Sequence, residues 1–264
     1  MSNPPLPIKV IIFCGGKGYR LREETEFRPK PLVEICGKPI LWHIMKRYEK
    51  YGLTDFILCL GYKGEMIRQY FLNYLSTNND VEIDIKSGGV TAYPHLKDNP
   101  PWKVTLVDTG QNAMTGARLK RVEKYIDTDF FMLTYGDGVA NINLKQLLQF
   151  HKQHGKIGTV TGVHPYPRFG ELIYERAVVK KFSEKPQSKD VIINGGFFVF
   201  NKKIFRYVTN SDSCTFEREP LEKLARDKEL SYFRHTGFWH CLDTYRDMEH
   251  LNELAHTRPA PWET

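Results

Sequence analysis

A run of apolar residues that ends in glycines constrains this sequence more than any other feature. Residues 8–13 are mostly β-branched, and residues 14–18 have the sequence Cys-Gly-Gly-Lys-Gly. This order predicts a buried strand followed by a loop whose bare backbone can come close to a ligand. Lys17, Arg20 and Lys30 add positive charge in and after the loop. We therefore predict a site for phosphate groups, since glycine amides and arginine both suit phosphate oxygens.

The two commonest glycine-loop motifs do not describe this loop. Residues 16–21 lack the last glycine of the dinucleotide-binding fingerprint, and no lysine followed by serine or threonine completes a P-loop. A second basic segment, Arg-Pro-Lys-Pro, lies at residues 28–31. The alternative to a phosphate site is an ordinary strand-turn-helix connection that binds nothing.

Composition limits the size and the partners of the protein. The chain has 264 residues, of which 41% are hydrophobic, and this suffices for a full core. We expect a single domain over residues 1–264, with a disordered start over residues 1–7. The net charge of +7 favours anionic partners, but the basic residues are dispersed and form no nucleic-acid motif. We therefore expect phosphorylated small molecules as partners and no nucleic acid.

The cysteines and the hydropathy pattern bear on where the protein works. None of the five cysteines has Cys-x-x-Cys spacing, and three lie in apolar runs, where a reduced thiol behaves as a small hydrophobic group. The first residues lack the pattern of a signal peptide, and no apolar run approaches the length of a membrane span. We expect a cytoplasmic protein that does not contact a membrane.

Alternating strand and helix patterns indicate the fold class. Apolar runs at residues 56–60, 104–108 and 130–135 predict buried strands, and residues 39–51 and 63–75 have the apolar stripe of a helix. This alternation predicts an α/β fold, with a Rossmann-like, mostly parallel mixed sheet flanked by helices.

Two further segments depart from this alternation. Alternating stretches at residues 172–174 and 178–182 predict a hairpin, which we interpret as a small β-rich elaboration on the substrate side. Residues 86–102 are rich in glycine, proline and asparagine and show no sustained period, so we predict a loop there after a strand at residues 81–85.

A carboxylate follows the predicted strand at residues 130–135, in the sequence Gly136-Asp137-Gly138. Flanked by glycines at the carboxyl end of a strand, Asp137 is well placed to hold a hard cation such as Mg²⁺ that bridges phosphate oxygens. The alternative is a tight Asp-Gly turn without a ligand.

These motifs together resemble a known family. The loop pattern Gly-Gly-x-Gly-x-Arg-Leu at residues 15–21, followed by Pro-Lys-Pro at residues 29–31, is similar to the signature of sugar-1-phosphate nucleotidyltransferases. Residues 42–45, 104–121 and 194–198 resemble the glucose-1-phosphate cytidylyltransferase branch of that family. The similarity extends over nearly the whole chain, from about residue 8 to residue 262. This resemblance implies the fold, the activity and the site residues that are described in the next three paragraphs.

The nucleotide would lie on the glycine loop and on the turns after two later strands. The residues expected to bind it are Phe13, Gly15, Gly16, Lys17, Gly18, Tyr19, Arg20, Lys30, Ala113, Arg118 and Gly136. Among them Arg20 and Lys30, together with Asp137, are the candidate catalytic residues. For Arg118 the alternative is an ordinary solvated cation on a helix.

The sugar phosphate and the metal would lie beside the nucleotide. The resemblance places Lys185, Asn194, Gly195, Glu217 and Glu219 on the sugar phosphate, and it pairs Asp243 with Asp137 as the two Mg²⁺ ligands. The alternative for Lys185 is an ordinary solvated lysine, and the alternative for residues 194–196 is a hairpin turn. Glu217 and Glu219 would otherwise only place favourable negative charge at a helix N-terminus.

The resemblance implies transfer of a cytidylyl group from CTP to α-D-glucose 1-phosphate or a related sugar phosphate, which gives CDP-glucose and pyrophosphate. The product would serve the synthesis of nucleotide sugars and surface polysaccharides, and we expect a homo-oligomer. Alternatives are a uridylyl- or thymidylyltransferase, or a nucleotide-sensing subunit without turnover. Tyr19 and Cys14 depart from the threonine and alanine usual in the family loop, and Ala117 replaces a common glycine, so the nucleotide pocket can differ in shape.

Overall fold

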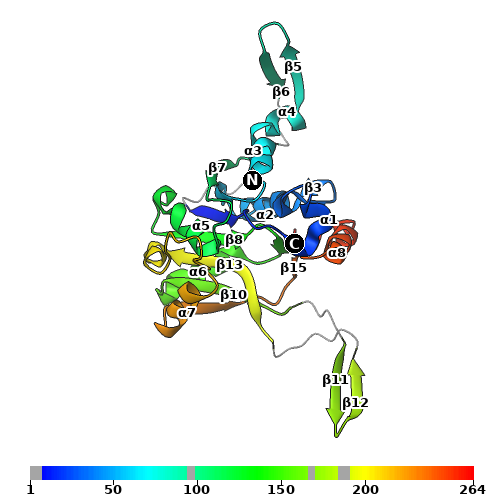
Figure 1. Cartoon of the computed structure of the whole chain (residues 1–264), viewed down its shortest axis with the longest axis vertical. Helices are drawn as coiled ribbons and strands as arrows, with labels where there is room; N and C mark the ends of the chain where they lie inside the picture. The colour runs from blue at the N-terminus through cyan, green and yellow to red at the C-terminus, as the bar shows by residue number, and fades with distance from the viewer. Residues whose placement is uncertain (1–7, 94–98, 166–169, 184–190) are drawn as a thin grey trace.

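A seven-stranded sheet forms the centre of the protein in a computed structural model that describes residues 8–93, 99–165, 170–183 and 191–264 (Figure 1). The strand order is β14-β10-β13-β8-β1-β4-β7. Their bounds are β1 Lys9–Phe13, β4 Asp55–Leu60, β7 Lys103–Asp108, β8 Phe130–Tyr135, β10 Gly158–Val163, β13 Ile193–Asn201 and β14 Leu230–Arg234. Only β13 runs antiparallel to its neighbours among these strands. The predicted α/β fold with a mostly parallel mixed sheet is confirmed, whereas the expected disorder of residues 1–7 lies outside the described residues.

Helices cover both faces of the sheet because side chains of each strand alternate between the two faces. Val10 and Ile12 of β1 face a core with α2, α3, α6 and α8, while Ile11 and Phe13 face a second core with α5 and α7. The helices are α1 Arg22–Thr25, α2 Ile40–Glu49, α3 Gly64–Leu72, α4 Tyr74–Asn78, α5 Thr115–Arg121, α6 Leu144–His154, α7 Glu219–Arg226 and α8 Tyr245–Ala255. Short 3₁₀ turns are η1 Tyr19–Leu21, η2 Lys30–Leu32, η3 Glu123–Tyr125 and η4 Lys202–Arg206. No helix among the described residues is both long and apolar enough to cross a membrane.

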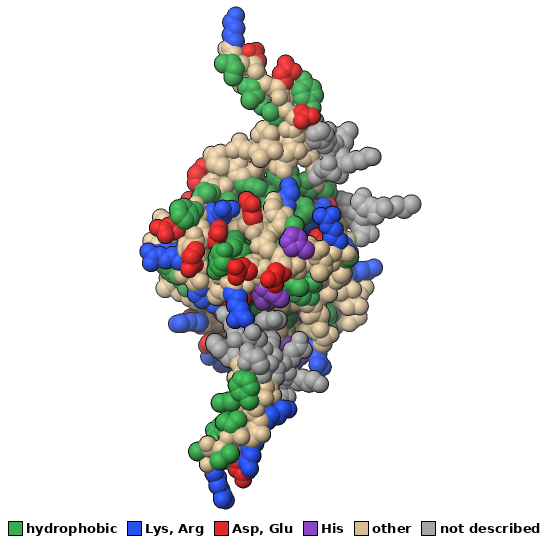
Figure 2. Space-filling model, turned by 90° about the vertical axis from the view of Figure 1, so that its right-hand side faces the viewer, with side chains coloured by type: hydrophobic (Ala, Val, Ile, Leu, Met, Phe, Trp, Pro, Cys, Tyr) green, Lys and Arg blue, Asp and Glu red, His purple; other side chains and the backbone are tan. Residues whose placement is uncertain are grey.

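Two hairpins extend from opposite ends of the molecule (Figure 1). They consist of β5 Asp80–Asp84 with β6 Gly89–Tyr93, and of β11 Glu171–Glu175 with β12 Val178–Ser183. The second hairpin confirms the hairpin predicted from residues 172–174 and 178–182. The first shows that the prediction of a loop over residues 86–102 was wrong in part, because β6 pairs with β5 and lies within that range. Hydrophobic side chains are exposed on both hairpins (Figure 2).

Small pairs of strands position residues at the carboxyl edge of the sheet. They are β2 Glu34–Ile35 with β3 Lys38–Pro39, and β9 Gly138–Ala140 with β15 Trp239–Cys241. In the second pair Cys241 lies opposite Gly138, and the Leu242 amide donates to the Asp137 carbonyl over 2.8 Å. Asp137 and Asp243 therefore lie side by side, although many elements separate them in the sequence.

The start of α8 fixes the segment that contains Asp243. The Thr244 side chain accepts a hydrogen bond from the Asp247 amide, and the Asp247 carboxylate accepts one from the Thr244 amide, which completes a capping box. The Asp247 carboxylate also accepts from the Asp243 amide over 3.0 Å. This cap leaves the Asp243 side chain outside the helix.

Candidate active site

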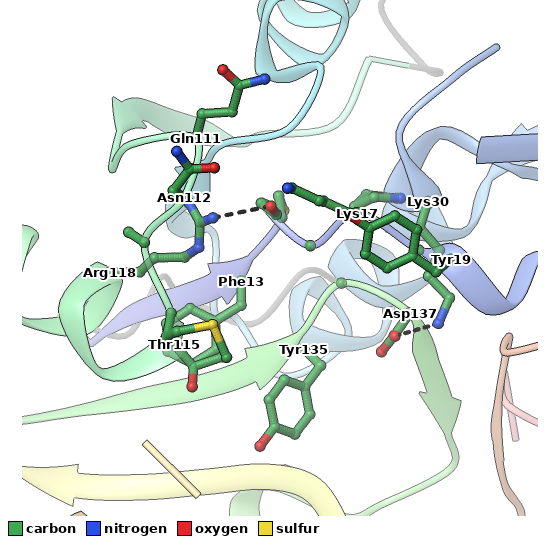
Figure 3. Close-up of a pocket in the computed structure, with 18 of the residues that line it drawn as sticks. Phe13, Lys17, Tyr19, Lys30, Gln111, Asn112, Thr115, Arg118, Tyr135 and Asp137 are labelled. Carbon is green, nitrogen blue, oxygen red and sulfur yellow. Dashed lines mark hydrogen bonds and ion pairs between the residues drawn. The ribbon is translucent and has the colours of Figure 1, made fainter. Parts of the chain in front are cut away.

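A cavity of about 630 Å³ lies at the carboxyl edge of the sheet, where the loops after β1, β7 and β8 meet. Figure 3 shows Lys30 and Asp137 facing each other at one side of it, away from Arg118. Every residue predicted for the nucleotide lines this cavity, which brings together segments from three separate parts of the chain: Phe13, Gly15, Gly16, Lys17, Gly18, Tyr19, Arg20, Lys30, Ala113, Arg118 and Gly136. The fold thus forms one concave surface from residues that the sequence identified separately.

Lys30 connects the two predicted metal ligands. Its Nζ atom lies 2.7 Å from Oδ2 of Asp137 and 2.8 Å from Oδ1 of Asp243. The Arg20 guanidinium donates to the other oxygen of Asp243 over 2.8 Å. The side chains of Lys30 and Asp243 are only 11% and 10% exposed, so the ion pair between them is largely shielded from water, whereas the Arg20 side chain is 70% exposed. We call these four residues the carboxylate cluster.

Protonation in the carboxylate cluster follows from its charges. Burial alone would lower the pKa of Lys30, but Asp137 and Asp243 outweigh it and raise that pKa. Burial alone would raise the pKa of Asp243, but Lys30 and then Arg20 outweigh it and lower that pKa. The stability from the depressed Asp243 pKa is therefore present near neutral pH, and it is lost as the pH falls through the folded-state value.

The opposite side of the cavity depends on a buried arginine. Arg118 is 4% exposed, and its guanidinium donates to the carbonyls of Leu60 over 2.8 Å and of Gly15 over 3.0 Å. It also donates to the Thr109 hydroxyl and the Gly110 carbonyl. The alternative of a solvated helix cation is therefore wrong. Arg118 joins the ends of β1, β4 and β7 behind the phosphate loop, while the edge of its side chain lines the cavity.

A smaller cavity of about 50 Å³ adjoins Asp137 on the predicted sugar side. Asn194 and Gly195 line it, and so does Tyr135, which also lines the larger cavity. Asn194 and Gly195 lie within β13, so the alternative of a hairpin turn at residues 194–196 is wrong. The Gly195 carbonyl accepts a hydrogen bond from the Trp239 indole over 2.7 Å.

Glu217 lines neither cavity itself, but it is held by the hydroxyl groups of Thr115 and Tyr135, which line the larger one. One carboxylate oxygen accepts from Tyr135 and the other accepts from Thr115, each over 2.6 Å. Burial and the neighbouring Glu217 raise the pKa of Tyr135, so its hydroxyl stays protonated and donates. Glu219, in the first turn of α7, lines neither cavity. Lys185 lies outside the described residues.

Comparison with known proteins identifies the family. The sequence model of the family described as "Nucleotidyl transferase" matches residues 9–256. The chain belongs to the nucleotidyl transferase family. It is 48% identical over 258 residues to a glucose-1-phosphate cytidylyltransferase of Salmonella typhi, and this match covers 97% of the chain and 99% of the relative. It is 46% identical to a probable glucose-1-phosphate cytidylyltransferase of Bacillus subtilis, with the same coverage.

Solved structures agree with this family. HddC from Yersinia pseudotuberculosis superposes with a TM-score of 0.66 at 26% identity, covering 93% of this chain and 98% of that one. The predicted resemblance to sugar-1-phosphate nucleotidyltransferases is therefore confirmed, together with the fold class.

The residues of this nucleotidyl transferase suit a hard divalent cation. Oxygens of Asp137 and Asp243 both lie within 2.8 Å of one nitrogen atom, so they converge on a single point. Among the described residues no group of three His, Cys, Asp or Glu side chains could hold a metal. Two carboxylates match the preference of Mg²⁺, which usually keeps water and takes further ligands from substrate phosphates.

Sequence reasoning missed several side chains of the cavity wall. They are Cys14, Pro31, Gln111, Asn112, Met114, Thr115 and Tyr135. Position gave a usable signal for Tyr135, since it is the last residue of a strand and directly precedes Gly136 and Asp137. No local pattern indicates that Thr115 and Tyr135 share the carboxylate of Glu217, because that contact depends on three separate elements.

Two neighbouring glycines of the phosphate loop allow a test of how closely the loop packs against Arg118. A Cβ atom on Gly15 would lie 2.3 Å from the Arg118 guanidinium, whereas one on Gly16 would meet nothing within 4 Å. Because hydrogen bonds hold the guanidinium in place, Gly15→Ala should lower the free energy of unfolding by about 2 kcal/mol. Gly16→Ala should change it by less than about 0.5 kcal/mol. Urea denaturation measures both, and equal stabilities would contradict the role given to Arg118.

Proposed function

We infer that this protein transfers the cytidylyl group of CTP to α-D-glucose 1-phosphate and releases pyrophosphate. The observation that supports this most is near full-length identity of 48% to a glucose-1-phosphate cytidylyltransferase, in a chain that retains the acidic and basic residues expected for the reaction. The CDP-glucose formed would enter the synthesis of nucleotide sugars and surface polysaccharides.

The reaction needs no covalent intermediate on the protein. An oxygen of the sugar phosphate attacks the α-phosphorus of CTP, the new P–O bond forms, and the bond from the α-phosphorus to the bridging oxygen of the β-phosphate breaks. The electron pair leaves with pyrophosphate, and no proton transfer is required because the attacking oxygen is already an anion. The protein therefore has to align the two substrates and to stabilise negative charge.

The larger cavity supplies these functions for the nucleotide. Backbone amides of residues 15–18 would face the triphosphate, with the guanidinium of Arg20 and the ammonium of Lys17 beside them. Lys30 would stabilise charge that develops at the α-phosphate, since it combines a buried position with access to the cavity.

The carboxylate cluster would complete the site. Asp137 and Asp243 would hold Mg²⁺, which when bound supplies positive charge to the phosphate oxygens. On the sugar side, Asn194, Gly195 and Glu217 would contact the hexose and Lys185 its phosphate. Glu217 can still accept from a sugar hydroxyl, because each of its oxygens has a second lone pair.

The exposed faces of the hairpins support the proposal of a homo-oligomer. Ile83 and Val90 lie opposite each other on one face of the β5–β6 hairpin and are 55% and 59% exposed. An isolated two-stranded hairpin is marginally stable in water, so this face gains stability if a second copy of the chain covers it.

The cysteines suit the proposed location in the cytoplasm, because all five are free thiols.

The oligomer proposal predicts that charges on one face of this hairpin lower the molar mass of the assembly and that charges on the other face do not. Ile83→Lys with Val90→Lys should lower the molar mass measured by sedimentation equilibrium, because two charges would be buried in the contact. The control, Glu82→Lys with Thr91→Lys, changes the pair on the other face. A monomeric wild type, or equal loss of mass in both variants, would contradict the proposed contact.

A substrate panel tests the proposed activity. Pyrophosphate release would be measured with CTP, UTP and dTTP against several hexose 1-phosphates. We expect CTP with glucose 1-phosphate to give the highest kcat/KM. Preference for UTP or dTTP would indicate a related transferase, and no release with any pair would indicate a nucleotide-sensing protein.

Neutral replacements test the two aspartates. Asp137→Asn and Asp243→Asn should each lower Mg²⁺-dependent kcat about a hundredfold or more, since each removes a charge that would hold the cation. Circular dichroism checks that both variants fold. A variant that keeps wild-type turnover at limiting Mg²⁺ would show that its residue does not hold the metal.

Tyr19 gives a test of base preference. Its side chain is 74% exposed at the cavity rim, and Lys17 lies over its ring with Nζ 5.9 Å from the ring centre. We expect the ring to cover the bound nucleotide, so Tyr19→Thr should change KM for CTP by a few-fold, in line with a contact worth about 0.5–1.5 kcal/mol. Competition between CTP, UTP and dTTP measures the preference, and a changed order of bases would show that the ring selects the base.

A further inference from the structure

Lys30 fills the space that a bridging cation would need. Its Nζ atom lies 2.7 Å from the Asp137 carboxylate and 2.8 Å from the Asp243 carboxylate. Oxygen ligands of Mg²⁺ lie at about 2.0–2.1 Å, so an ion bound to the same two oxygens would come into contact with the ammonium. The cation and the Lys30 ammonium therefore cannot both bridge these two oxygen atoms.

Charge balance in the carboxylate cluster supports the same exclusion. Two carboxylates face the ammonium of Lys30 and the guanidinium of Arg20, so the formal charge of the four side chains sums to zero. A neutral cluster attracts a dication weakly. The balance changes when a triphosphate enters the adjoining cavity, because its negative charge attracts both the ammonium and the cation.

The local backbone allows Lys30 to move by its side chain alone. Lys30 begins the 3₁₀ turn η2, between Pro29 and the buried Pro31, so the main chain at this point is restricted. Its side chain lines the larger cavity, which gives the ammonium a second position toward bound phosphate. A lysine stem has four rotatable bonds, and rotation about them moves the charge while the turn stays fixed.

We propose that Lys30 occupies the cation position of the nucleotide-free protein and exchanges with the divalent cation when nucleotide binds. The exchange rests on the metal site of the proposed function and adds an order of binding to it. The free protein binds the cation weakly, and bound nucleotide then frees the carboxylates because its phosphates attract the Lys30 ammonium. Lys30 thus keeps the two carboxylates paired until substrate is present.

Mn²⁺ binding to the nucleotide-free protein tests this exchange. The loss of the free Mn²⁺ electron paramagnetic resonance signal would be titrated for wild type, Lys30→Met and Arg20→Met. The two variants remove the same charge, but only Lys30 lies between the carboxylates, and the Arg20 side chain is 70% exposed. We expect Lys30→Met to bind Mn²⁺ about tenfold tighter than wild type or more, and Arg20→Met to gain less than about fivefold, as for an exposed ion pair.

Thermal stability gives a second measurement on the same proteins. Lys30→Met leaves two carboxylates without their shared ammonium and should melt below wild type, and Mn²⁺ should raise its Tm by several degrees while changing that of wild type little. If Lys30→Met does not fold, Lys30→Gln replaces it, because its amide can still donate to one carboxylate. Three results would overturn the exchange. They are equal Mn²⁺ affinity in wild type and Lys30→Met, an equal gain in Mn²⁺ affinity in Lys30→Met and Arg20→Met, and no Mn²⁺ binding in any of the proteins. Pyrophosphate release by wild type decides the proposed activity separately.

Discussion

One largely shielded ammonium group determines how the active site of this protein is assembled. Lys30 follows the phosphate loop, Asp137 follows β8 and Asp243 precedes α8, yet the two carboxylates lie 2.7 Å and 2.8 Å from the same nitrogen atom. Lys30 and Asp243 are the shielded members, with side chains 11% and 10% exposed, and removing either would leave an uncompensated charge, which typically costs about 3–5 kcal/mol. The ion pairs therefore make the geometry of the site and the stability of the fold depend on the same contacts.

A second buried cation shapes the other side of the cavity. Within the described part of the chain, Arg118 forms no ion pair and instead donates to backbone carbonyls at the ends of three parallel strands. Gly15 and Gly61 lack side chains where the guanidinium lies, since a Cβ on either would come within 2.4 Å of it. The phosphate loop is thus fixed from behind by hydrogen bonds, and its front remains available to a ligand.

Much of the fold could be predicted from the sequence, because apolar runs such as residues 56–60 identify strands buried on both faces. The hairpin strand β6 was missed since glycine and proline around it resemble loop composition. In the site, the glycine loop, Lys30 and Asp137 have local patterns. The contact of Tyr135 with Glu217 and the bridging position of Lys30 have none, since each joins segments that meet only in the folded chain.

A crystal structure with Mn²⁺ and a non-hydrolysable CTP analogue tests the central claim most directly, because the anomalous signal of manganese locates the ion independently of the protein atoms. We expect an anomalous peak between Asp137 and Asp243, with the Lys30 ammonium displaced from both carboxylates onto a phosphate oxygen. A peak elsewhere, or Lys30 still bridging the carboxylates beside bound nucleotide, would contradict this account of the site.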